Sequence, residues 1–240
     1  MRPALKTIEH TKSGAALPIS FAGETVMLDP AGILFFESLG ALVVSDLHLE
    51  KGSSFARRRQ FLPPYDTTAT LARLMTLVEK YDPSIIISLG DSFHDDDASH
   101  RLDAHSIETI FAMTKNRNMV WVTGNHDPSA PDHLPGDCVT EIALGRIMLR
   151  HIPLASEAGF EIAGHFHPCA SIQSRGKRVR RPCFASDGKR MIMPSFGVLT
   201  GGLHLANPAF LELFDQSKLR AYMQGRDQIF PVAAKDIVGL

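Results

Sequence analysis

The chain has 240 residues and a formal net charge of -1 at pH 7. A nearly neutral chain does not attract polyanions through its overall charge, so any nucleic-acid binding must depend on local basic segments. The hydrophobic fraction of 44% is ordinary for a globular protein, so a core of useful size can form in one large domain or in one domain with an appendage.

No sign of export or of membrane insertion is present. Residues 1–16 are polar and mixed, so we expect an irregular N-terminus, and no apolar core follows the first charges as in a signal peptide. No apolar run reaches the roughly 18 residues that a membrane helix needs. The odd number of cysteines, without C-x-x-C spacing, argues against a disulfide framework and favours a cytoplasmic protein.

A hairpin is predicted near the start of the chain. Residues 24–28 and 33–36 are largely apolar or β-branched, and they flank an Asp-Pro-Ala-Gly turn at 29–32 with proline at its second position. We expect this hairpin to lead directly into the next strand.

That next strand carries the first chemical motif. The apolar run 42–44 continues into Asp46 and His48. In an extended chain, residues i and i+2 point to the same side, so a carboxylate and an imidazole can converge on one cation. Taken alone, the pair is better explained by a turn cap and a surface histidine than by a metal site, and the later motifs reverse this preference.

The chain then changes to loop and helix signals. A long loop is predicted over residues 50–66, and a loop of this length after a ligand-bearing strand is typically functional or disordered. Helices are predicted over 67–80 and 99–117, where apolar residues recur at spacings of three and four, with Asp66 as the N-cap of the first. Alternating strands and helices predict parallel strands with right-handed crossovers.

Three later strands end like the first, because residues of metal-ligand type follow each apolar run. Glycines precede most of them and suit a backbone that turns tightly or approaches a ligand. The motifs are Gly90-Asp91 after strand 85–89, Gly124-Asn125-His126-Asp127 after strand 119–123, Gly164-His165-Phe166-His167 after strand 160–163, and His151 after a further strand-like run, 146–150.

Beyond residue 127, short strands alternate with turns and the helical signals largely vanish. The segment 175–181 contains five positive charges in seven residues, and we interpret it as a basic hairpin near the metal site. Such a hairpin either binds anions or forms a solvated edge that discourages strand pairing. Residues 208–232 mix helical and strand-like signals, so no element is predicted there.

The series D-x-H, G-D, G-N-H-D, H and G-H-x-H, in this order, resembles the calcineurin-like metallophosphoesterase superfamily. The resemblance covers residues 41–168. It implies an α/β fold class, a four-layer α/β/β/α sandwich with mixed β-sheets. We expect a single domain over residues 1–240, with catalytic motifs in 45–168 and the basic hairpin and C-terminal segment in 169–240.

The superfamily pattern implies two divalent metal ions and a phosphodiesterase in which a metal-bridging hydroxide attacks phosphorus. Asp91 would bridge both ions, one of them completed by Asp46, His48 and His167, the other by Asn125, His151 and His165. Two cations, two aspartates and a bridging hydroxide leave about one net positive charge, which suits an anionic phosphodiester. These ligand types favour Mn²⁺, with Fe or Zn²⁺ as alternatives.

Three further residues receive catalytic roles from the resemblance. His126 would protonate the leaving oxygen, with Asp127 tuning it, unless His126 is merely a turn residue. His94 completes the motif Gly-Asp-Ser-Phe-His, which is similar to the form found in DNA-repair nucleases of the superfamily. In those nucleases, the histidine contacts the scissile phosphate.

The segments 45–58, 62–67 and 89–95 resemble a smaller family, the bacterial ligase-associated DNA damage response endonucleases (PdeM). This resemblance implies single-stranded or damaged DNA as the substrate and a functional association with a DNA ligase and a helicase. The expected DNA-binding residues are Arg57, Arg58, Arg178, Arg180 and Arg181.

Two other functions remain open on the same fold. A phosphodiesterase or phosphatase for a small nucleotide, or for another small phosphoester, would use the same metal centre with different pocket walls. A non-catalytic scaffold is the second alternative, but scaffold members of the superfamily lose ligands and here the series is complete. The oligomeric state is not predicted.

Overall fold

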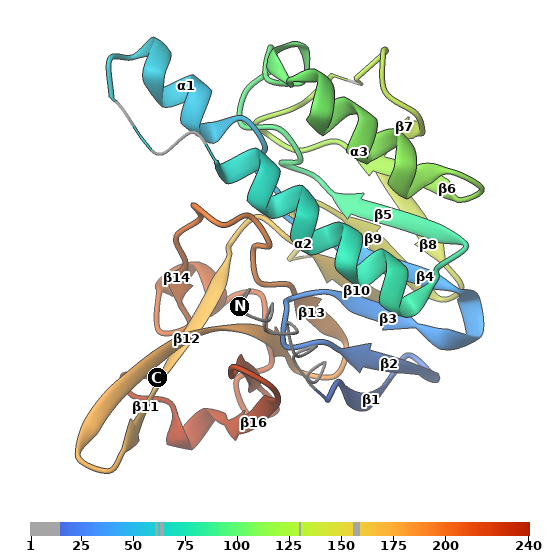
Figure 1. The fold of residues 1–240 in the computed structure, drawn as a ribbon. Helices are drawn as coiled ribbons and strands as arrows, with labels where there is room; N and C mark the ends of the chain where they lie inside the picture. Colours follow the sequence, from blue (N-terminus) through green and yellow to red (C-terminus); the bar gives the residue numbers. More distant parts are fainter. Residues whose placement is uncertain (1–14, 61, 63–64, 130, 156–158) are drawn as a thin grey trace, which may run out of the picture.

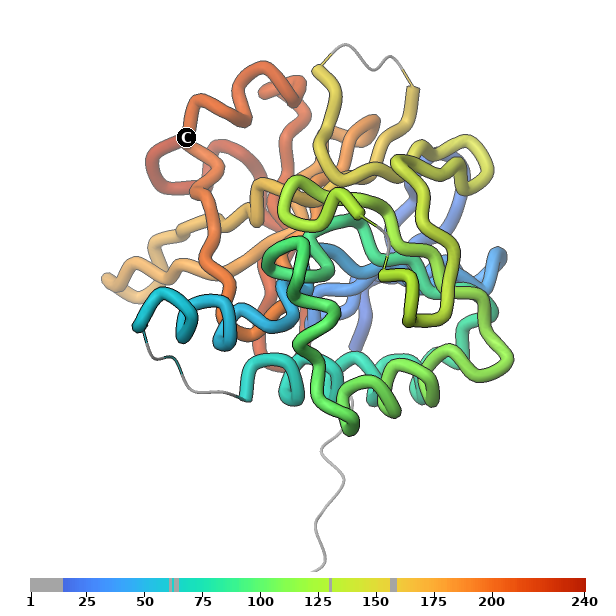
Figure 2. The backbone as a smooth tube through the Cα atoms, turned by 90° about the horizontal axis from the view of Figure 1, so that it is seen from above, coloured from blue at the N-terminus to red at the C-terminus, as the bar shows by residue number. Residues whose placement is uncertain are grey.

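The computed structural model describes residues 15–60, 62, 65–129, 131–155 and 159–240. The irregular terminus predicted for residues 1–16 therefore lies almost entirely outside the described residues. Two β-sheets pack face to face, and helices α2 (Asp66–Tyr81) and α3 (Ala104–Thr114) lie side by side on the outer face of the first sheet (Figures 1 and 2). None of the described helices is long and apolar enough to cross a membrane.

The first sheet follows the order of the chain. Its strands are β1 (Leu17–Phe21), β2 (Glu24–Leu28), β3 (Leu34–Phe36), β4 (Ala41–Val44), β5 (Ile85–Leu89), β6 (Asn118–Val122) and β7 (Asp137–Val139). The predicted hairpin is confirmed as antiparallel β2 and β3. Strands β4, β5 and β6 are parallel, as the alternation of strands and helices predicted, so their carboxyl ends meet at one edge of the sheet.

The second sheet is mixed and is built from the C-terminal part of the chain. Its strands are β8 (Glu141–Leu144), β9 (Ile147–Arg150), β10 (Phe160–Ala163), β11 (Pro168–Ser174), β12 (Lys177–Ser186), β13 (Arg190–Ile192), β14 (Leu203–His204), β15 (Arg220–Gln224) and β16 (Ile229–Ala233). Strand β10 lies between β9 and β13 and is parallel to both. The basic segment forms the hairpin between β11 and β12, and the unassigned tail supplies β15 and β16.

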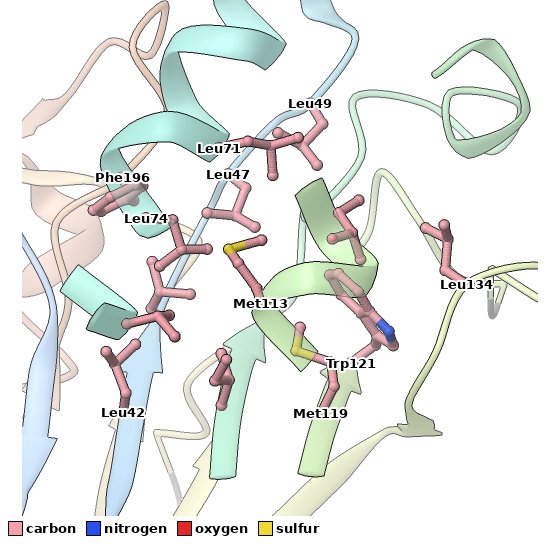
Figure 3. Packing of buried hydrophobic residues seen from close by; sticks show 14 of the residues in the cluster. Leu42, Leu47, Leu49, Leu71, Leu74, Met113, Met119, Trp121, Leu134 and Phe196 are labelled. Carbon is pink, nitrogen blue, oxygen red and sulfur yellow. The ribbon is translucent and has the colours of Figure 1, made fainter. Parts of the chain in front are cut away.

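The sheets are held together by alternating side chains. On β4, Leu42 (Figure 3) and Val44 belong to the cluster under the helices. Ala41 and Val43 belong to the cluster between the two sheets. A third cluster covers the outer face of the second sheet and includes Phe210 of the 3-10 helix η3 (Pro208–Phe210). The four-layer fold class is confirmed, and in the described part of the chain its fourth layer consists of η3 and turns.

The predicted loop over residues 50–66 is wrong in part, because Lys51–Arg57 forms helix α1. A helix of seven residues is too short to show a clear apolar period. The amide of Gly52, in its first turn, donates to Asp66 Oδ2 at 2.9 Å, so the carboxylate that stabilises α1 comes from another element. Asp66 is accordingly not the N-cap of α2; Tyr65 occupies that position.

The predicted helix over 99–117 is also shorter than expected. A 3-10 helix, η2 (Ser99–Arg101), is followed by the separate helix α3. Asp103 caps α3, since its Oδ1 accepts a hydrogen bond from the amide of Ser106 at 2.7 Å. This cap fixes the start of α3 three residues beyond the 3-10 turn.

A buried ion network crosses the centre of the second sheet. Glu161 on β10 is completely buried and binds Arg150 of β9 at 2.7 Å and Arg190 of β13. The three strands are therefore joined by charge as well as by backbone hydrogen bonds. Arg150 directly precedes His151, and Glu161 lies on the strand that leads to His165. The network therefore fixes the two segments that carry these histidines.

We predict that Glu161→Ala lowers the free energy of unfolding by about 3–5 kcal/mol, because it leaves the buried Arg190 guanidinium without its carboxylate, while Arg150 keeps its pairing with Glu141. Glu141→Ala is the matched control: Glu141 also pairs with Arg150, at 2.9 Å, but its side chain is 47% exposed. The control should lose no more than about 1 kcal/mol. Urea denaturation of both variants measures the difference, and equal losses would contradict the prediction.

Candidate metal centre

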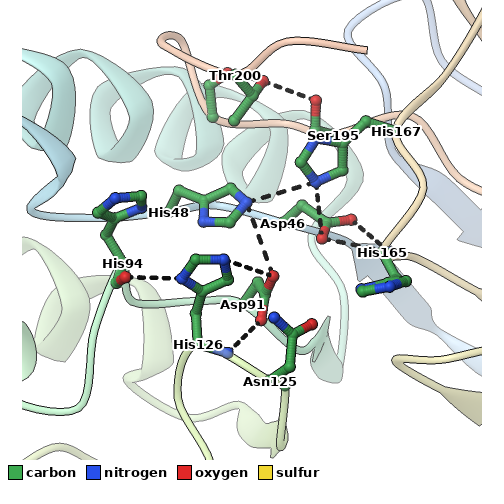
Figure 4. A network of polar contacts seen from close by, with 12 residues as sticks. Asp46, His48, Asp91, His94, Asn125, His126, His165, His167, Ser195 and Thr200 are labelled. Atoms are coloured by element: carbon green, nitrogen blue, oxygen red, sulfur yellow. Dashed lines mark hydrogen bonds and ion pairs between the residues drawn. The ribbon is translucent and has the colours of Figure 1, made fainter. Parts of the chain in front are cut away.

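The predicted ligands come together at the strand ends of both sheets. In the first sheet, Asp46 and His48 follow β4, Asp91 follows β5 and Asn125 follows β6; in the second, His151 follows β9, and His165 and His167 follow β10. Figure 4 shows most of these side chains directed toward a common centre. All seven residues predicted as metal ligands thus lie in one cluster.

The first group of donors consists of Asp46, His48 and His167, whose ligand atoms lie within 4.8 Å of one another. Asp46 Oδ1 is 3.1 Å from His167 Nε2, and the Nε2 atoms of His48 and His167 are 3.4 Å apart. Two imidazole nitrogens facing each other beside a carboxylate have the donor chemistry of a transition-metal site.

The second group surrounds His151. Its Nδ1 donates to the carbonyl of Leu89 at 2.9 Å, so Nε2 carries a lone pair unless the ring is protonated. That lone pair lies 3.0 Å from Asn125 Oδ1, 3.3 Å from Asp91 Oδ1 and 3.3 Å from His165 Nδ1. Acceptor atoms repel one another at these distances. A cation placed among them would be coordinated by all of their lone pairs and would remove this repulsion. The residues therefore fit a metal ion.

Asp91 lies between the two groups. Its Oδ1 is 3.3 Å from His151 Nε2, while its Oδ2 is 3.9 Å from His48 Nε2. The backbone amide of His126 donates to Oδ1 at 2.9 Å and fixes the carboxylate plane. One carboxylate therefore reaches both groups of donors.

The electrostatics prepare these side chains for cations. Burial lowers the pKa of His48 to about 3, although Asp46 and Asp91 act in the opposite direction. Burial by itself would raise the pKa of Asp91, but a protonated His151 ring, through its charge and a hydrogen bond from Nε2, outweighs burial and holds that pKa below its usual value. At neutral pH, His48 is thus neutral and Asp91 ionised, the states that metal ligation requires.

The backbone at the cluster is strained. Five of the seven predicted ligands have left-handed φ angles, which are uncommon outside glycine, although aspartate and histidine tolerate them better than most residues. They are Asp46 (55°), His48 (45°), Asp91 (47°), His165 (71°) and His167 (45°). Strained residues persist where the surrounding structure holds them in place, and they cluster at functional sites.

Asp127 supplies much of that support. Its carboxylate accepts hydrogen bonds from the amides of Asp91 and Gly124 at 2.9 Å, and of Ser92 and Phe93 at 2.7 and 3.1 Å. These contacts hold the Asp91 loop, and the tuning of His126 by Asp127 that the resemblance implies stays a prediction.

Two glycines permit the close packing of the ligand loops. A Cβ at Gly124 would lie 2.2 Å from the backbone nitrogen of Asp91, and one at Gly164 would lie 2.0 Å from Ser45 Oγ. Any larger residue at either position would displace a predicted ligand. The glycines of the sequence motifs therefore serve close approach rather than flexibility.

His126 and His94 form a pair at the edge of the cluster. His126 Nδ1 donates to the carbonyl of His94 at 2.9 Å, and their rings stack with centroids 5.2 Å apart. His126 Nε2 therefore faces the cluster, 4.0 Å from Asp91 Oδ2, and its side chain is 40% exposed. Burial, followed by the charge of Lys51, lowers the pKa of His94 to about 4, so its ring is neutral at neutral pH.

The arginines predicted to bind DNA are divided among different places. Arg57 lies on α1 and pairs with the exposed Asp97 at 3.4 Å, so part of its charge is compensated. Arg58 is exposed nearby. On β12, Arg180 Nε donates to Cys169 Sγ at 2.9 Å and Arg180 Nη2 to the carbonyl of Gly202 at 2.6 Å, whereas Arg178 and Arg181 are exposed.

One part of the site was missed by the sequence reasoning. The loop 194–202 passes beside His167, and there Ser195 Oγ donates to Thr200 Oγ1 at 2.6 Å (Figure 4). It contains no metal-ligand residue types. Its glycines and the pair of hydroxyls are its only distinguishing signals in the sequence.

A cluster of carboxylate, imidazole and amide donors, divided into two groups by a shared aspartate between two mixed sheets, defines a metal-dependent hydrolase of phosphoesters. Comparison with known protein families matches residues 41–184 to the calcineurin-like phosphoesterases. The chain belongs to this family, as the order of its motifs predicted. No curated protein sequence matches the chain.

One solved structure has the same fold. The chain is similar to the nuclease MPE from Pseudomonas putida, with 29% sequence identity and a TM-score of 0.70 over 90% of this chain and 100% of that one. It also matches the phosphoesterase Yfce from E. coli, with 17% identity and a TM-score of 0.40 over 81% of this chain and 98% of that one. The first likeness confirms the arrangement of the two sheets.

We predict that Asp91→Ala abolishes activity and removes metal from both groups of donors, since this carboxylate reaches both. Asp97→Ala, at an exposed carboxylate that follows on the same loop, is the matched control and should keep metal and activity. Elemental analysis after Mn²⁺ loading should give two ions per wild-type chain. A single tightly bound ion in the metal-replete wild type would contradict the prediction.

Proposed function

We propose that this phosphoesterase is a dinuclear-metal phosphodiesterase that cleaves single-stranded or damaged DNA during repair. The observation that carries the proposal is the shared Asp91 between two groups of donors, because two-metal sites stabilise both the attacking and the leaving oxygen of a phosphoryl transfer. The likeness to a nuclease over the whole length of that protein supports a nucleic-acid substrate.

The metals, when bound, would supply a nucleophile at neutral pH and neutralise charge on the phosphoryl oxygens. Mn²⁺ suits these ligands best, since two carboxylates and an amide oxygen accompany the imidazoles. His126 is the general acid in this proposal. The carbonyl of His94 holds its Nδ1–H, so Nε2 is the atom that donates a proton to the leaving oxygen.

The cellular role follows from the resemblance to ligase-associated endonucleases. In this proposal the protein processes DNA ends or lesions in functional association with a DNA ligase and a helicase. Its three cysteines are free, which fits a cytoplasmic location. The exposed Arg58, Arg178 and Arg181 offer positive charge to a DNA backbone despite the neutral chain.

Activity with Mn²⁺ on three substrates side by side tests the function. Bis-p-nitrophenyl phosphate, a diester, should be hydrolysed faster than the monoester p-nitrophenyl phosphate, and single-stranded DNA should be cleaved. Raising the salt concentration should weaken DNA cleavage steeply and affect the small diester little, because counterion release accompanies each phosphate contact. Hydrolysis of both small esters without any DNA cleavage would favour a small-nucleotide enzyme instead.

His126→Ala should separate chemistry from metal binding. The metal content should stay near that of the wild type, while kcat for DNA falls on the order of 10²-fold, the usual contribution of a general acid. The loss should be much smaller with bis-p-nitrophenyl phosphate, because p-nitrophenolate leaves without a proton. Equal losses on both substrates would exclude His126 as the general acid.

A further inference from the structure

A cavity of about 620 Å³ adjoins the metal centre at His167. Ser195 and Thr200 belong to its lining, and Figure 4 shows them beside His167, with Asn125 on the opposite side of the cluster. Its volume suits a ligand of nucleotide size. The cavity therefore extends the site in one direction beyond the reacting phosphorus.

The lining is strongly basic. Three arginines, Arg73, Arg180 and Arg181, line the cavity, and among its described lining residues there is no aspartate or glutamate. Guanidinium groups bind phosphate oxygens in a bidentate manner. The chemistry of the cavity is thus that of an anion site, separate from the cations proposed next to it.

The wall of the cavity is fixed to the segment that carries the first donors. The amide of Phe196 donates to the carbonyl of Ser45 at 2.9 Å, and that of Gly197 to the carbonyl of Asp46 at 3.1 Å. A Cβ at Gly197 would lie 2.2 Å from the carbonyl oxygen of Leu47, so glycine allows this contact. The cavity and the donors consequently keep a constant separation.

The three arginines differ in how firmly they are held. Arg73 donates to the carbonyl of Phe196 at 3.0 Å and lies 4.2 Å from the centre of its ring, and Arg180 is bound to Cys169 and Gly202. These two shape the wall. The side chain of Arg181 makes a single hydrogen bond to the described residues, from Nη1 to the carbonyl of Arg180 at 3.3 Å. Most of its guanidinium donors therefore face no protein partner among these residues.

We propose that this cavity binds the phosphate next to the scissile phosphodiester in a nucleic-acid strand, and that Arg181 is the residue that contacts it. The inference rests on the proposed function and narrows it: the preferred substrate carries a second, flanking phosphate. The other basic residues are placed differently, since Arg57 pairs with Asp97 and Arg178 does not line the cavity.

Trinucleotides test the proposal directly. Each has one phosphodiester at the scissile position, and its neighbouring linkage, on the 5′ or the 3′ side, is either a phosphodiester or an uncharged methylphosphonate. The wild type should prefer the charged neighbouring linkage on one side of the scissile bond, either the 5′ or the 3′ side. On that side, kcat/KM should be about tenfold or more higher for the phosphodiester than for the methylphosphonate, the size expected for hydrogen bonds to a charged group. Product analysis assigns the bond that was cleaved.

Arg181→Gln should remove most of this preference for the charged neighbour. Lys177→Gln is the matched control, because it removes one positive charge from the same hairpin outside the cavity, and it should keep the preference. Arg181→Lys, which retains charge without the planar fork, should restore part of it. Urea denaturation confirms that all three variants are folded.

Three outcomes would overturn the inference. A wild type that cleaves trinucleotides with charged and with uncharged neighbouring linkages equally well, on either side, has no flanking-phosphate site, although its nuclease function stands. A loss of preference as large in Lys177→Gln as in Arg181→Gln would make the effect one of general charge. A wild type that ignores trinucleotides and hydrolyses a dinucleoside diphosphate would place the second phosphate in a small nucleotide, and the proposed nuclease function would then fail as well.

Discussion

The strained backbone of the ligand loops is the constraint on which the metal centre depends. Left-handed φ angles turn the chain sharply after β4, β5 and β10, so that these loops aim carboxylates and imidazoles at one point. Four amide hydrogen bonds to Asp127 and the absence of a Cβ at Gly124 and Gly164 hold this geometry. Preorganisation here is thus a property of backbone packing as much as of the donors themselves.

The second half of the centre depends on buried charge. His151 and His165 stand at the ends of β9 and β10, and the ion network of Glu161 joins these strands to β13. A carboxylate buried among apolar strands is unfavourable unless it is paired, and its two arginines provide that pairing. The same pairing keeps the two histidines in register with the donors of the first sheet.

Much of this could be predicted from the sequence, because donor types at strand ends and the order of motifs are local signals. The parallel strands and the clustering of Asp46, Asp91 and His167 followed from them. Helix α1 could not be predicted, since the carboxylate that accepts a hydrogen bond from its first turn, that of Asp66, comes from another element. The function of Asp127 and the wall around Thr200 also depend on contacts distant in sequence, which no local pattern records.

The order of the strands has a consequence for synthesis of the chain. The first sheet uses residues 17–139 only, so all its strands can pair before the second sheet has been translated. At that stage the nascent protein presents Asp46, His48, Asp91 and Asn125, which form an incomplete and largely oxygen-based half-site. Strand β10 pairs with its neighbour β13 only after the last predicted ligand, His167, has been translated. The set of predicted ligands is therefore completed late, when β9 and β10 bring His151, His165 and His167 to the strand ends of the first sheet.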